Sequence, residues 1–172
     1  RMVGLSLRPK SIRWIDVCRR SAHTFGMTRL LIYDDRGSEN NRDQLAPIHD
    51  LRASFELRTG GLCTLDRISR QLNMPIHAVS LYATADDHKL PAIVADRHPH
   101  TWIEAGDLPQ WIASSDEEVI VVNGRCISIP PQCLETLDQP ASDGQVVLCG
   151  RFSAKRATEL AHSAFRYKST TA

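Results

Sequence analysis

The sequence predicts an α/β fold, in which a mainly parallel β-sheet carries helices on its faces. Short apolar runs alternate along the chain with amphipathic segments of helical period, and this alternation is typical of such sheets. Hydrophobic residues make up 42% and charged residues 24% of the 172 residues, so the chain is able to bury a core. The length favours one domain or part of a larger one.

The first predicted strand is Leu30–Tyr33, an apolar run that ends in the acidic pair Asp34-Asp35. A long connection follows, and the next periodic segment predicts a helix over residues 65–72, whose apolar side chains share one face. Thr64 stands directly before this segment and is a candidate N-cap, because its hydroxyl can accept a hydrogen bond from a free amide of the first turn.

The remaining elements follow in chain order, each marked by a local signal. Strands are predicted at 76–83 and 90–95, a loop at 96–111, two strands joined by an Asn123-Gly124 turn at 119–129, a short helix after Pro131, a strand at 145–150 and a helix at 154–165. Ser153 is the expected N-cap of the last helix.

The two ends of the chain differ from this pattern. Residues 1–27 carry six basic residues against one acid, Asp16, which is typical of an organelle transit peptide or of upstream sequence in front of a start at Met27. We expect residues 1–27 to be a basic extension that is disordered or not native. Residues 28–166 are expected to form the domain, and residues 167–172 a polar tail.

Charge and cysteine content limit the function classes. The formal net charge of +1 gives no strong attraction to nucleic acid or to a membrane surface. No apolar run approaches the roughly 18 residues of a membrane span. The five cysteines form no Cys-x-x-Cys pair, which favours free, mostly buried thiols in the reducing cytoplasm. The sequence does not indicate an oligomeric state.

The long connection after the first strand is the most informative stretch. LAPIHDLRASFELRTGG, residues 45–61, contains Arg52, Arg58 and the pair Gly60-Gly61, and long connections are usually functional or disordered. Ligands of parallel sheets bind beyond the carboxyl ends of the strands, where Asp34-Asp35 and Asn123-Gly124 also fall. Arginine forks bind phosphate oxygens in pairs, and a helix amino terminus adds amide donors. The sequence therefore predicts a phosphate site here.

Each of these residues also has a simpler interpretation. Arg52 and Arg58 fit ordinary surface arginines or partners of Asp50 and Glu56, and Asn123-Gly124 fits a plain turn.

Two further pairs of residues have a candidate role. His98 and His100 could provide two metal ligands from one extended segment, although no second cluster completes the set. Trp102 and Trp111 flank an acidic loop, and they could stack on a base or a sugar or pack in a core.

At the long connection the sequence resembles a known family, the alternative bacterial sugar nucleotidyltransferases, which are relatives of N-acetylglucosamine-1-phosphate uridylyltransferase. In that family the segment typically reads L-x-P-L-T-x-T-R-P-x-x-x-L-R-x-G. Seven residues fall on this pattern without a gap: Leu45, Pro47, Ile48, Arg52, Leu57, Arg58 and Gly60. Glu56 also fits the acidic position of the segment written as R-x-x-x-[DE]-L-R-x-G. The later Asn-Gly-Arg of the family is matched by VVNGR, which ends at Arg125, and the resemblance spans residues 28–165.

The resemblance implies a mainly parallel, Rossmann-like nucleotidyltransferase sheet and a UDP-N-acetylglucosamine diphosphorylase-like reaction. A nucleotidyl group would pass from a nucleoside triphosphate to a sugar 1-phosphate, with release of pyrophosphate and with Mg²⁺ as cofactor. Arg52 and Arg58 would be the catalytic residues. The nucleotide-binding residues would be Asp34, Asp35, Gly60, Asn123 and Gly124.

The sequence also departs from that family. Ala53 replaces the proline that follows the first arginine, and the glycine-rich G-x-G-T-R signature of the conventional enzymes is missing. Arg125 stands where those enzymes have a magnesium-binding aspartate, so Mg²⁺ would need Asp34 or Asp35 or would not be held. The carboxyl-terminal hexapeptide repeats are also missing, so the domain is expected to be incomplete relative to the family. A second hypothesis is therefore a non-catalytic domain of the same fold that binds a nucleotide or sugar phosphate or serves assembly.

Overall fold

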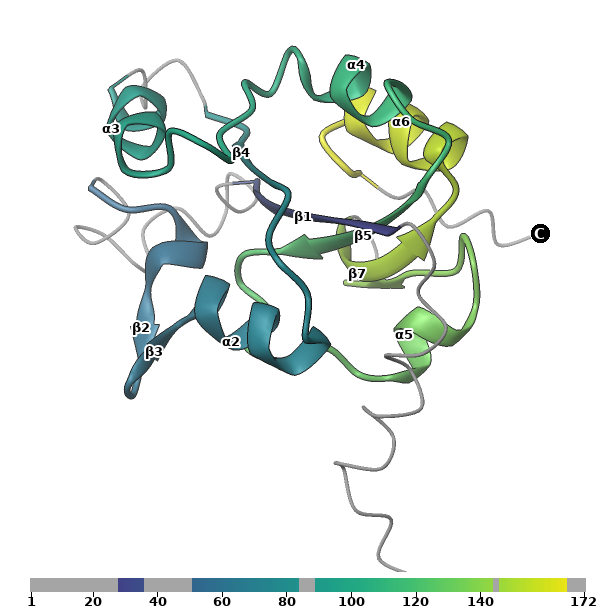
Figure 1. The fold of residues 1–172 in the computed structure, drawn as a ribbon, viewed down its shortest axis with the longest axis horizontal. Coiled ribbons are helices and arrows are strands. Elements are labelled where there is room, and N and C mark those ends of the chain that lie inside the picture. Colours follow the sequence, from purple (N-terminus) through teal and green to yellow (C-terminus); the bar gives the residue numbers. More distant parts are fainter. Residues whose placement is uncertain (1–27, 36–50, 84–88, 144–145, 167–172) are drawn as a thin grey trace, which may run out of the picture.

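The computed structural model describes residues 28–35, 51–83, 89–143 and 146–166. Its centre is a five-stranded sheet in the order β4-β1-β5-β7-β6 (Figure 1). The predictions for residues 1–27 and for the tail at 167–172 lie outside the described residues.

Three parallel strands form one side of the sheet. β1 (Thr28–Asp34) lies between β4 (Ala78–Leu81) and β5 (Glu118–Asn123) and runs parallel to both. β7 (Val147–Phe152) pairs antiparallel with β5 and with the two-residue β6 (Ala141–Ser142). The predicted α/β fold is confirmed, with a mixed, mostly parallel sheet.

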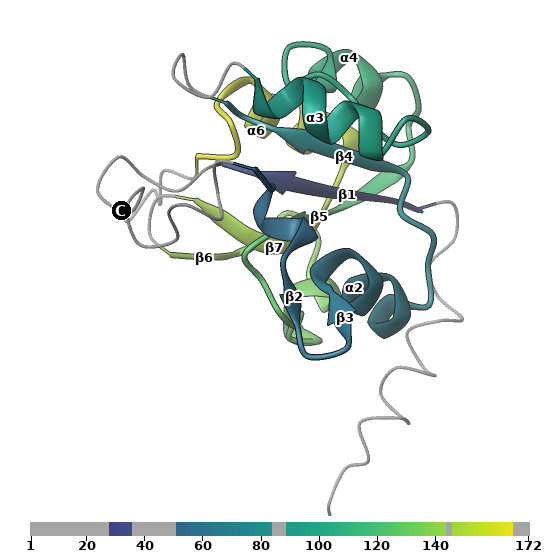
Figure 2. The same cartoon turned by 90° about the vertical axis from the view of Figure 1, so that its left-hand side faces the viewer.

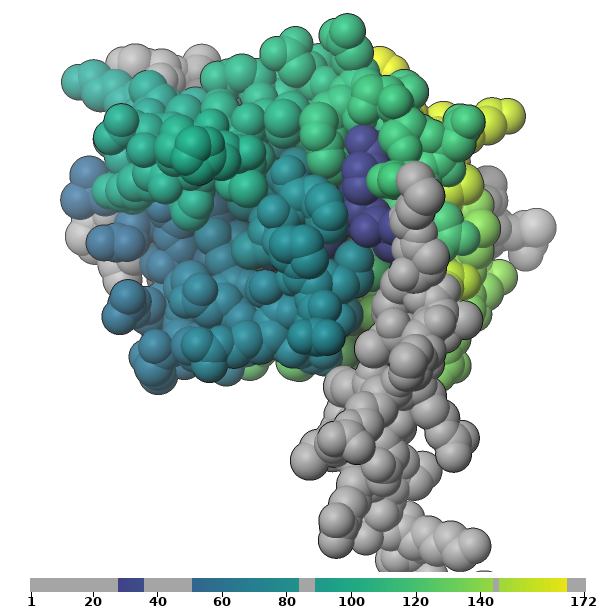
Figure 3. All heavy atoms as spheres, in the orientation of Figure 1, coloured from purple at the N-terminus to yellow at the C-terminus, as the bar shows by residue number. Residues whose placement is uncertain are grey.

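The side chains of β1 alternate between two hydrophobic clusters. Leu30 and Ile32 belong to one cluster, Leu31 and Tyr33 belong to the other, and all four are fully buried. Successive side chains of a strand point to opposite faces, so a strand that is covered on both faces reads as a continuous apolar run. On the face drawn in Figure 3, β1 is visible as a small purple patch between neighbouring elements.

Helices cover both faces of the sheet. α2 (Thr64–Leu72), α3 (Leu90–Arg97) and α5 (Gln132–Glu135) contribute apolar side chains to the cluster of Leu30 and Ile32. α4 (Leu108–Ala113) and α6 (Ala154–His162) contribute to the opposite cluster. Figure 2 shows α2 on one side of β1 and both α4 and α6 on the other.

The connection from β1 to α2 contains three short elements. The 3-10 helix η3 (Ser54–Glu56) is buried, whereas β2 (Arg58–Thr59) and β3 (Leu62–Cys63) form a hairpin that lies further from the sheet. α2 begins at Thr64 itself, and Cys63 takes the N-cap position, where its side chain accepts no capping bond from a backbone amide. The prediction of Thr64 as the N-cap is therefore wrong, because Thr64 is already the first residue of the helix.

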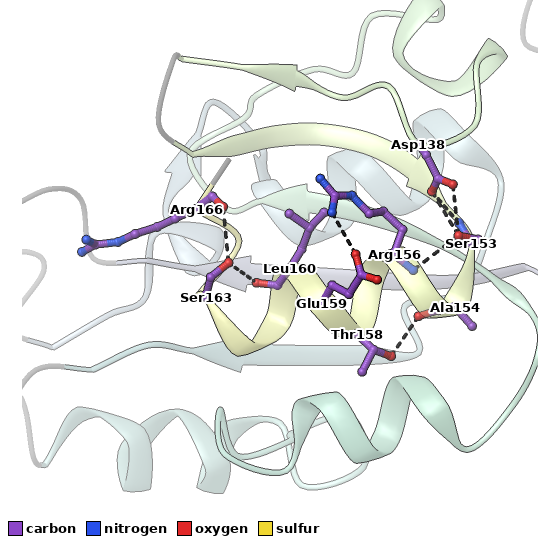
Figure 4. Close-up of polar contacts among 9 residues, drawn as sticks. All are labelled: Asp138, Ser153, Ala154, Arg156, Thr158, Glu159, Leu160, Ser163 and Arg166. Carbon is purple, nitrogen blue, oxygen red and sulfur yellow. Dashed lines mark hydrogen bonds and ion pairs between the residues drawn. The ribbon is translucent and has the colours of Figure 1, made fainter. Parts of the chain in front are cut away.

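The predicted amino-terminal cap of α6 is confirmed. The Ser153 hydroxyl accepts a hydrogen bond from the Arg156 amide at 3.3 Å and donates one to the Asp138 carboxylate at 3.0 Å (Figure 4). The Asp138 carboxylate also accepts a hydrogen bond from the Ser153 amide at 2.9 Å. This network fixes the turn between β7 and α6.

The carboxyl end of α6 differs from the prediction, which continued the helix to residue 165. The helix ends at His162, and the chain turns through Ala164 and Phe165, whose φ angles are 53° and 56°. This turn places the fully buried Phe165 ring beside Tyr33, with 4.5 Å between the ring centroids. The left-handed turn therefore lets the end of α6 contribute to the core.

Two predictions between β4 and β5 are wrong. Residues 90–95 were expected to form a strand, but they form most of α3, with Pro91 in the first turn, where its missing N–H is not needed. A short apolar run fits a buried helix as well as a strand, so periodicity could not separate the two. The expected loop at 96–111 contains the end of α3 and most of α4.

The predicted hairpin at Asn123-Gly124 is also wrong. β5 ends at Asn123, and its antiparallel partner is β7 rather than the residues directly after the turn. The chain instead passes under α2, where the Gln71 carboxamide donates to the Ile129 carbonyl at 2.6 Å and accepts from the Ile129 amide at 3.0 Å. Ile129 thus finds its backbone hydrogen bonds at Gln71 of α2 rather than in a strand pair with β5.

Replacing Ser153 by Ala should lower the free energy of unfolding by about 1–2 kcal/mol, because the cap of α6 and the hydroxyl bond to Asp138 are lost. For a domain of this size the melting temperature should fall by several degrees. Thermal unfolding followed by circular dichroism measures this, with Ser128→Ala, an exposed serine, as the control. Equal melting temperatures for the two variants would contradict the capping role.

Candidate functional site

The carboxyl ends of β1 and β5 meet at one edge of the sheet. Tyr33 lies opposite Asn123 in the parallel register, and the Gly124 amide donates to the Tyr33 carbonyl at 2.7 Å. The polar residues that follow the two strands are therefore neighbours. We call this group the carboxyl-edge cluster: Asp34, Asp35, Asn123, Gly124 and Arg125.

Asp35 is the centre of the cluster. Its carboxylate accepts a hydrogen bond from Asn123 Nδ2 at 3.3 Å and pairs with Arg125 Nη2 at 2.9 Å. The Asn123 carboxamide oxygen accepts in turn from the Arg125 amide at 3.0 Å and from Arg125 Nε at 3.3 Å. Asn123 is fully buried, so it fixes the directions of both charged side chains.

Asp34 joins the cluster to the long connection. Its buried carboxylate accepts a hydrogen bond from the Ser54 amide at 2.6 Å, across 20 positions of sequence. Gly124 allows this approach, because a Cβ atom there would lie 2.6 Å from Ser54 Oγ and 2.8 Å from the Phe55 amide nitrogen. A glycine is therefore required at the end of β5 by contact with η3, rather than by a hairpin.

Glu56 holds η3 in place from the other side. Its buried carboxylate accepts a hydrogen bond from the Ala53 amide at 3.0 Å and pairs with Arg97 Nη1 at 3.1 Å and with His98 Nε2 at 3.2 Å. Arg97 also donates to the Leu51 carbonyl at 2.9 Å. We call this arrangement the Glu56 clamp, and it ties η3 to the carboxyl end of α3.

The Glu56 clamp changes the acidity of its carboxyl group. Burial raises the pKa of Glu56, but the hydrogen bonds from His98 and from the Ala53 amide, together with the positive charge of Arg97, outweigh burial. The pKa of Glu56 therefore lies below its ordinary value, and the group is ionised in the folded protein at neutral pH.

The two arginines of the predicted phosphate site lie on the surface. Arg52 is exposed directly before η3, and Arg58 is exposed in β2. Gly60 forms the exposed hairpin turn with a φ of 79°, which suits a glycine. Within the described part of the chain neither guanidinium is held by a hydrogen bond or ion pair, and Glu56 takes Arg97 and His98 as partners instead.

The predicted residues are thus only partly brought together. Asp34, Asp35, Asn123 and Gly124 meet at the carboxyl edge, and Arg52 precedes the segment that contacts them. Arg58 and Gly60 lie in the β2–β3 hairpin, and no hydrogen bond or ion pair joins them to the cluster among the described residues.

Sequence reasoning missed the role of Ser54. It considered Glu56 only as a motif match and a possible partner of the two arginines, and Arg125 only as the end of the Asn-Gly-Arg match at the metal-ligand position. A signal existed for Glu56, because a glutamate three residues after Ala53 has the spacing at which a side chain bonds back to an amide at the start of a helix. A signal also existed for Arg125. It comes shortly after the end of one predicted strand, and the carboxyl end of the first predicted strand carries the acids Asp34 and Asp35.

The magnesium site that the resemblance implies would need several oxygen donors in one place. Among residues 28–35, 51–83, 89–143 and 146–166, no group of three or more His, Cys, Asp or Glu side chains is arranged to hold a metal ion. The guanidinium of Arg125 lies 2.9 Å from the Asp35 carboxylate, and its charge opposes a divalent cation at the same oxygens. His98 is engaged with Glu56 rather than with a metal. The described residues do not fit a magnesium site.

No family model, no curated protein and no solved structure matches the chain. None of the helices in the described residues is both long enough and apolar enough to cross a bilayer. The case for a function therefore rests on the carboxyl-edge cluster and the segment that contacts it.

Replacing Glu56 by Ala should lower the free energy of unfolding by about 2–3 kcal/mol, because a buried charged acceptor of three partners is removed. Urea unfolding measures the change. Asp96→Ala, which removes an exposed acid on α3 next to Arg97, is the matched control and should change stability by less than about 0.5 kcal/mol. Equal effects of the two variants would contradict the Glu56 clamp.

The difference in free energy of unfolding between the wild type and Glu56→Gln should depend on pH. The folded pKa lies below the unfolded value of about 4.3, so the ionised Glu56 stabilises the fold above that pH, and this contribution is lost as the pH falls through the folded pKa. Urea unfolding should show a constant difference in free energy of unfolding near neutral pH. This difference should become smaller below about pH 4. A difference that stays unchanged in acid would show that the charge of Glu56 does not contribute.

Proposed function

We propose that this chain is a nucleotidyltransferase-fold domain that transfers a nucleotidyl group from a nucleoside triphosphate to a sugar 1-phosphate. One observation carries the proposal: three motifs of the resemblance converge on one edge of the sheet. The acids at the end of β1, the η3 segment and the Asn-Gly-Arg at the end of β5 touch one another. Ser54 and Asp34 are 20 positions apart in sequence, and Asn123 and Asp35 are 88 apart. Ligands of parallel sheets bind at this edge.

The reaction needs positive charge around a crowded set of phosphates. An oxygen of the sugar 1-phosphate attacks the α-phosphorus of the nucleotide, a new phosphorus–oxygen bond forms, and the bond to the β-phosphate oxygen breaks as pyrophosphate leaves. Positioning and charge stabilisation supply most of the catalysis in such transfers. Arg52 and Arg58 are exposed and free of internal partners among the described residues, so their guanidinium forks remain open to phosphate oxygens.

The cluster residues receive supporting roles in this proposal. Asn123 has no exposed surface, so we assign it a positioning role toward Asp35 and Arg125. Gly124 admits the η3 segment to the edge, and the Glu56 clamp keeps that segment, and with it the backbone next to Arg52, in a fixed position. Preorganised charges of this kind avoid reorganisation during the reaction.

A second candidate is a non-catalytic domain that binds a nucleotide or a sugar phosphate. The Arg125–Asp35 ion pair favours it, because it places a guanidinium against the carboxylate that a catalytic magnesium ion would need. In that case Arg52 and Arg58 would bind an anion that is not turned over.

Measuring pyrophosphate release over a panel of nucleoside triphosphates and sugar 1-phosphates, with and without Mg²⁺, separates the two candidates. Release with at least one pair supports transfer. Saturable binding of a nucleotide or a sugar phosphate without pyrophosphate release supports the binding domain. The absence of both binding and release would reject both candidates.

Arg58→Ala should weaken binding of a nucleoside triphosphate about ten- to a hundred-fold, since a charge-assisted contact contributes roughly 1.5–3 kcal/mol. Arg58→Lys should recover only part of the affinity, because it keeps the charge and loses the fork. Titration calorimetry measures the three affinities, and Arg156→Ala, which removes a partly exposed arginine on the opposite face, is the control. Equal affinities for Arg58→Ala and the control would remove Arg58 from the site.

A further inference from the structure

A second candidate site lies at the opposite end of the sheet. An open hollow of about 490 Å³ borders α4, and its lining includes Trp102, Trp111, Glu104, Asp107, Gln110 and Ser114. Arg29, the second residue of β1, stacks on the Trp111 ring, so the hollow belongs to the amino-terminal end of the strand. The carboxyl-edge cluster begins at Asp34, about 16 Å further along β1. The hollow is therefore separate from the proposed nucleotide site.

Both indole walls are held in place, Trp102 through the backbone of its neighbours and Trp111 through Arg29. The residues around Trp102 bond to the outer edge of β4, since the Val79 amide donates to the Thr101 carbonyl at 2.8 Å and the Ile103 amide donates to the Val79 carbonyl at 3.0 Å. The Arg29 guanidinium lies 4.4 Å from the centroid of the Trp111 ring and donates to the Trp111 carbonyl at 2.8 Å. The two rings are thus fixed walls that remain partly exposed.

The polar groups of the hollow are left available by the local structure. Asp107 is the N-cap residue of α4, but its carboxylate makes no capping bond, because its backbone is already helical and Pro109 lacks one of the amides that a cap would use. Within the described residues the side chains of Asp107 and Gln110 make no hydrogen bond. Glu104 accepts from the Trp102 indole nitrogen at 3.1 Å, which leaves its other oxygen open.

The charges of the residues that line the hollow determine which class of ligand fits it. Two carboxylates and no basic side chain line the hollow, so an anion such as a phosphate is repelled. A cation on Trp111 is disfavoured as well, because Arg29 already places a positive charge against that ring. What remains is a neutral molecule with an apolar face for the indoles and hydroxyl groups for the carboxylates and the carboxamide.

We propose that this hollow binds a neutral carbohydrate, a sugar ring that carries no phosphate. The C–H face of the ring packs against Trp102 or Trp111, where its slightly positive hydrogens meet the negative faces of the indoles. The hydroxyl groups donate to Glu104 and Asp107 and exchange hydrogen bonds with Gln110. The site is a binding site without chemistry and does not depend on nucleotidyl transfer.

Tryptophan fluorescence tests the proposal directly. The chain has three tryptophans, and after Trp14→Phe the two that remain, Trp102 and Trp111, both line the hollow. This variant is titrated with glucose, galactose, mannose, N-acetylglucosamine and their disaccharides. We expect a saturable change with at least one sugar. Gln110→Ala and Asp107→Ala should each weaken it about ten-fold, through one lost hydrogen bond.

Matched controls are Gln132→Ala and Asp96→Ala, which remove the same groups from exposed positions elsewhere and should leave the affinity unchanged. All four side chains are exposed, and circular dichroism melting confirms that the variants are folded. The proposal is overturned if no sugar gives a saturable change. It is also overturned if the hollow variants bind a sugar as tightly as the controls.

A charge series tests the class of ligand. Glucose 6-phosphate should bind at the hollow at least about ten-fold more weakly than glucose, and Asp107→Asn should narrow this difference, because it removes one repelling charge. Tetramethylammonium is the cationic probe. A response to tetramethylammonium without a response to sugars, or tighter binding of glucose 6-phosphate than of glucose, would overturn the assignment to neutral carbohydrate.

Discussion

Burial of β1 on both faces is the constraint on which the rest of the structure depends. Four consecutive side chains, Leu30–Tyr33, are fully buried, so each face of the strand requires its own cover of helices. Parallel neighbours on both sides oblige the chain to cross over the sheet between strands. The same arrangement brings the ends of β1 and β5 together, and it therefore determines which polar residues share the edge of the sheet.

At and beside that edge the negative charges of the carboxylates are neutralised by protein groups rather than by water. Asp35 is matched by Arg125, Asp34 by a backbone amide of η3, and Glu56 by Arg97 and His98. A buried carboxylate is costly unless it has hydrogen bonds of this kind. Gly124 lies against Ser54 and Phe55 of η3, so the long connection packs directly on the end of β5.

Elements with strong periodicity were predicted from the sequence, and those that depend on distant partners were not. The apolar run of β1 and the cap of α6 are local signals, whereas residues 90–95 carry too short a run to separate helix from strand. Asn123-Gly124 looked like a hairpin because pairing of β5 with β7 depends on residues far along the chain. The meeting of acids with Asn123 followed from topology, but the Glu56–Arg97 pair joins residues 41 positions apart and carries no local signal.

The segment Thr101–Ile103, which bonds to the outer edge of β4, affects how two molecules of this protein can pair. An open strand edge is a template for pairing with another chain, which leads to aggregation. On the outer edge of β4 the amide and carbonyl of Val79 are already bonded to Thr101 and Ile103, and at the other edge β6 offers only two residues. Within the described residues both borders of the sheet are thus poor templates for edge-to-edge pairing with a second molecule.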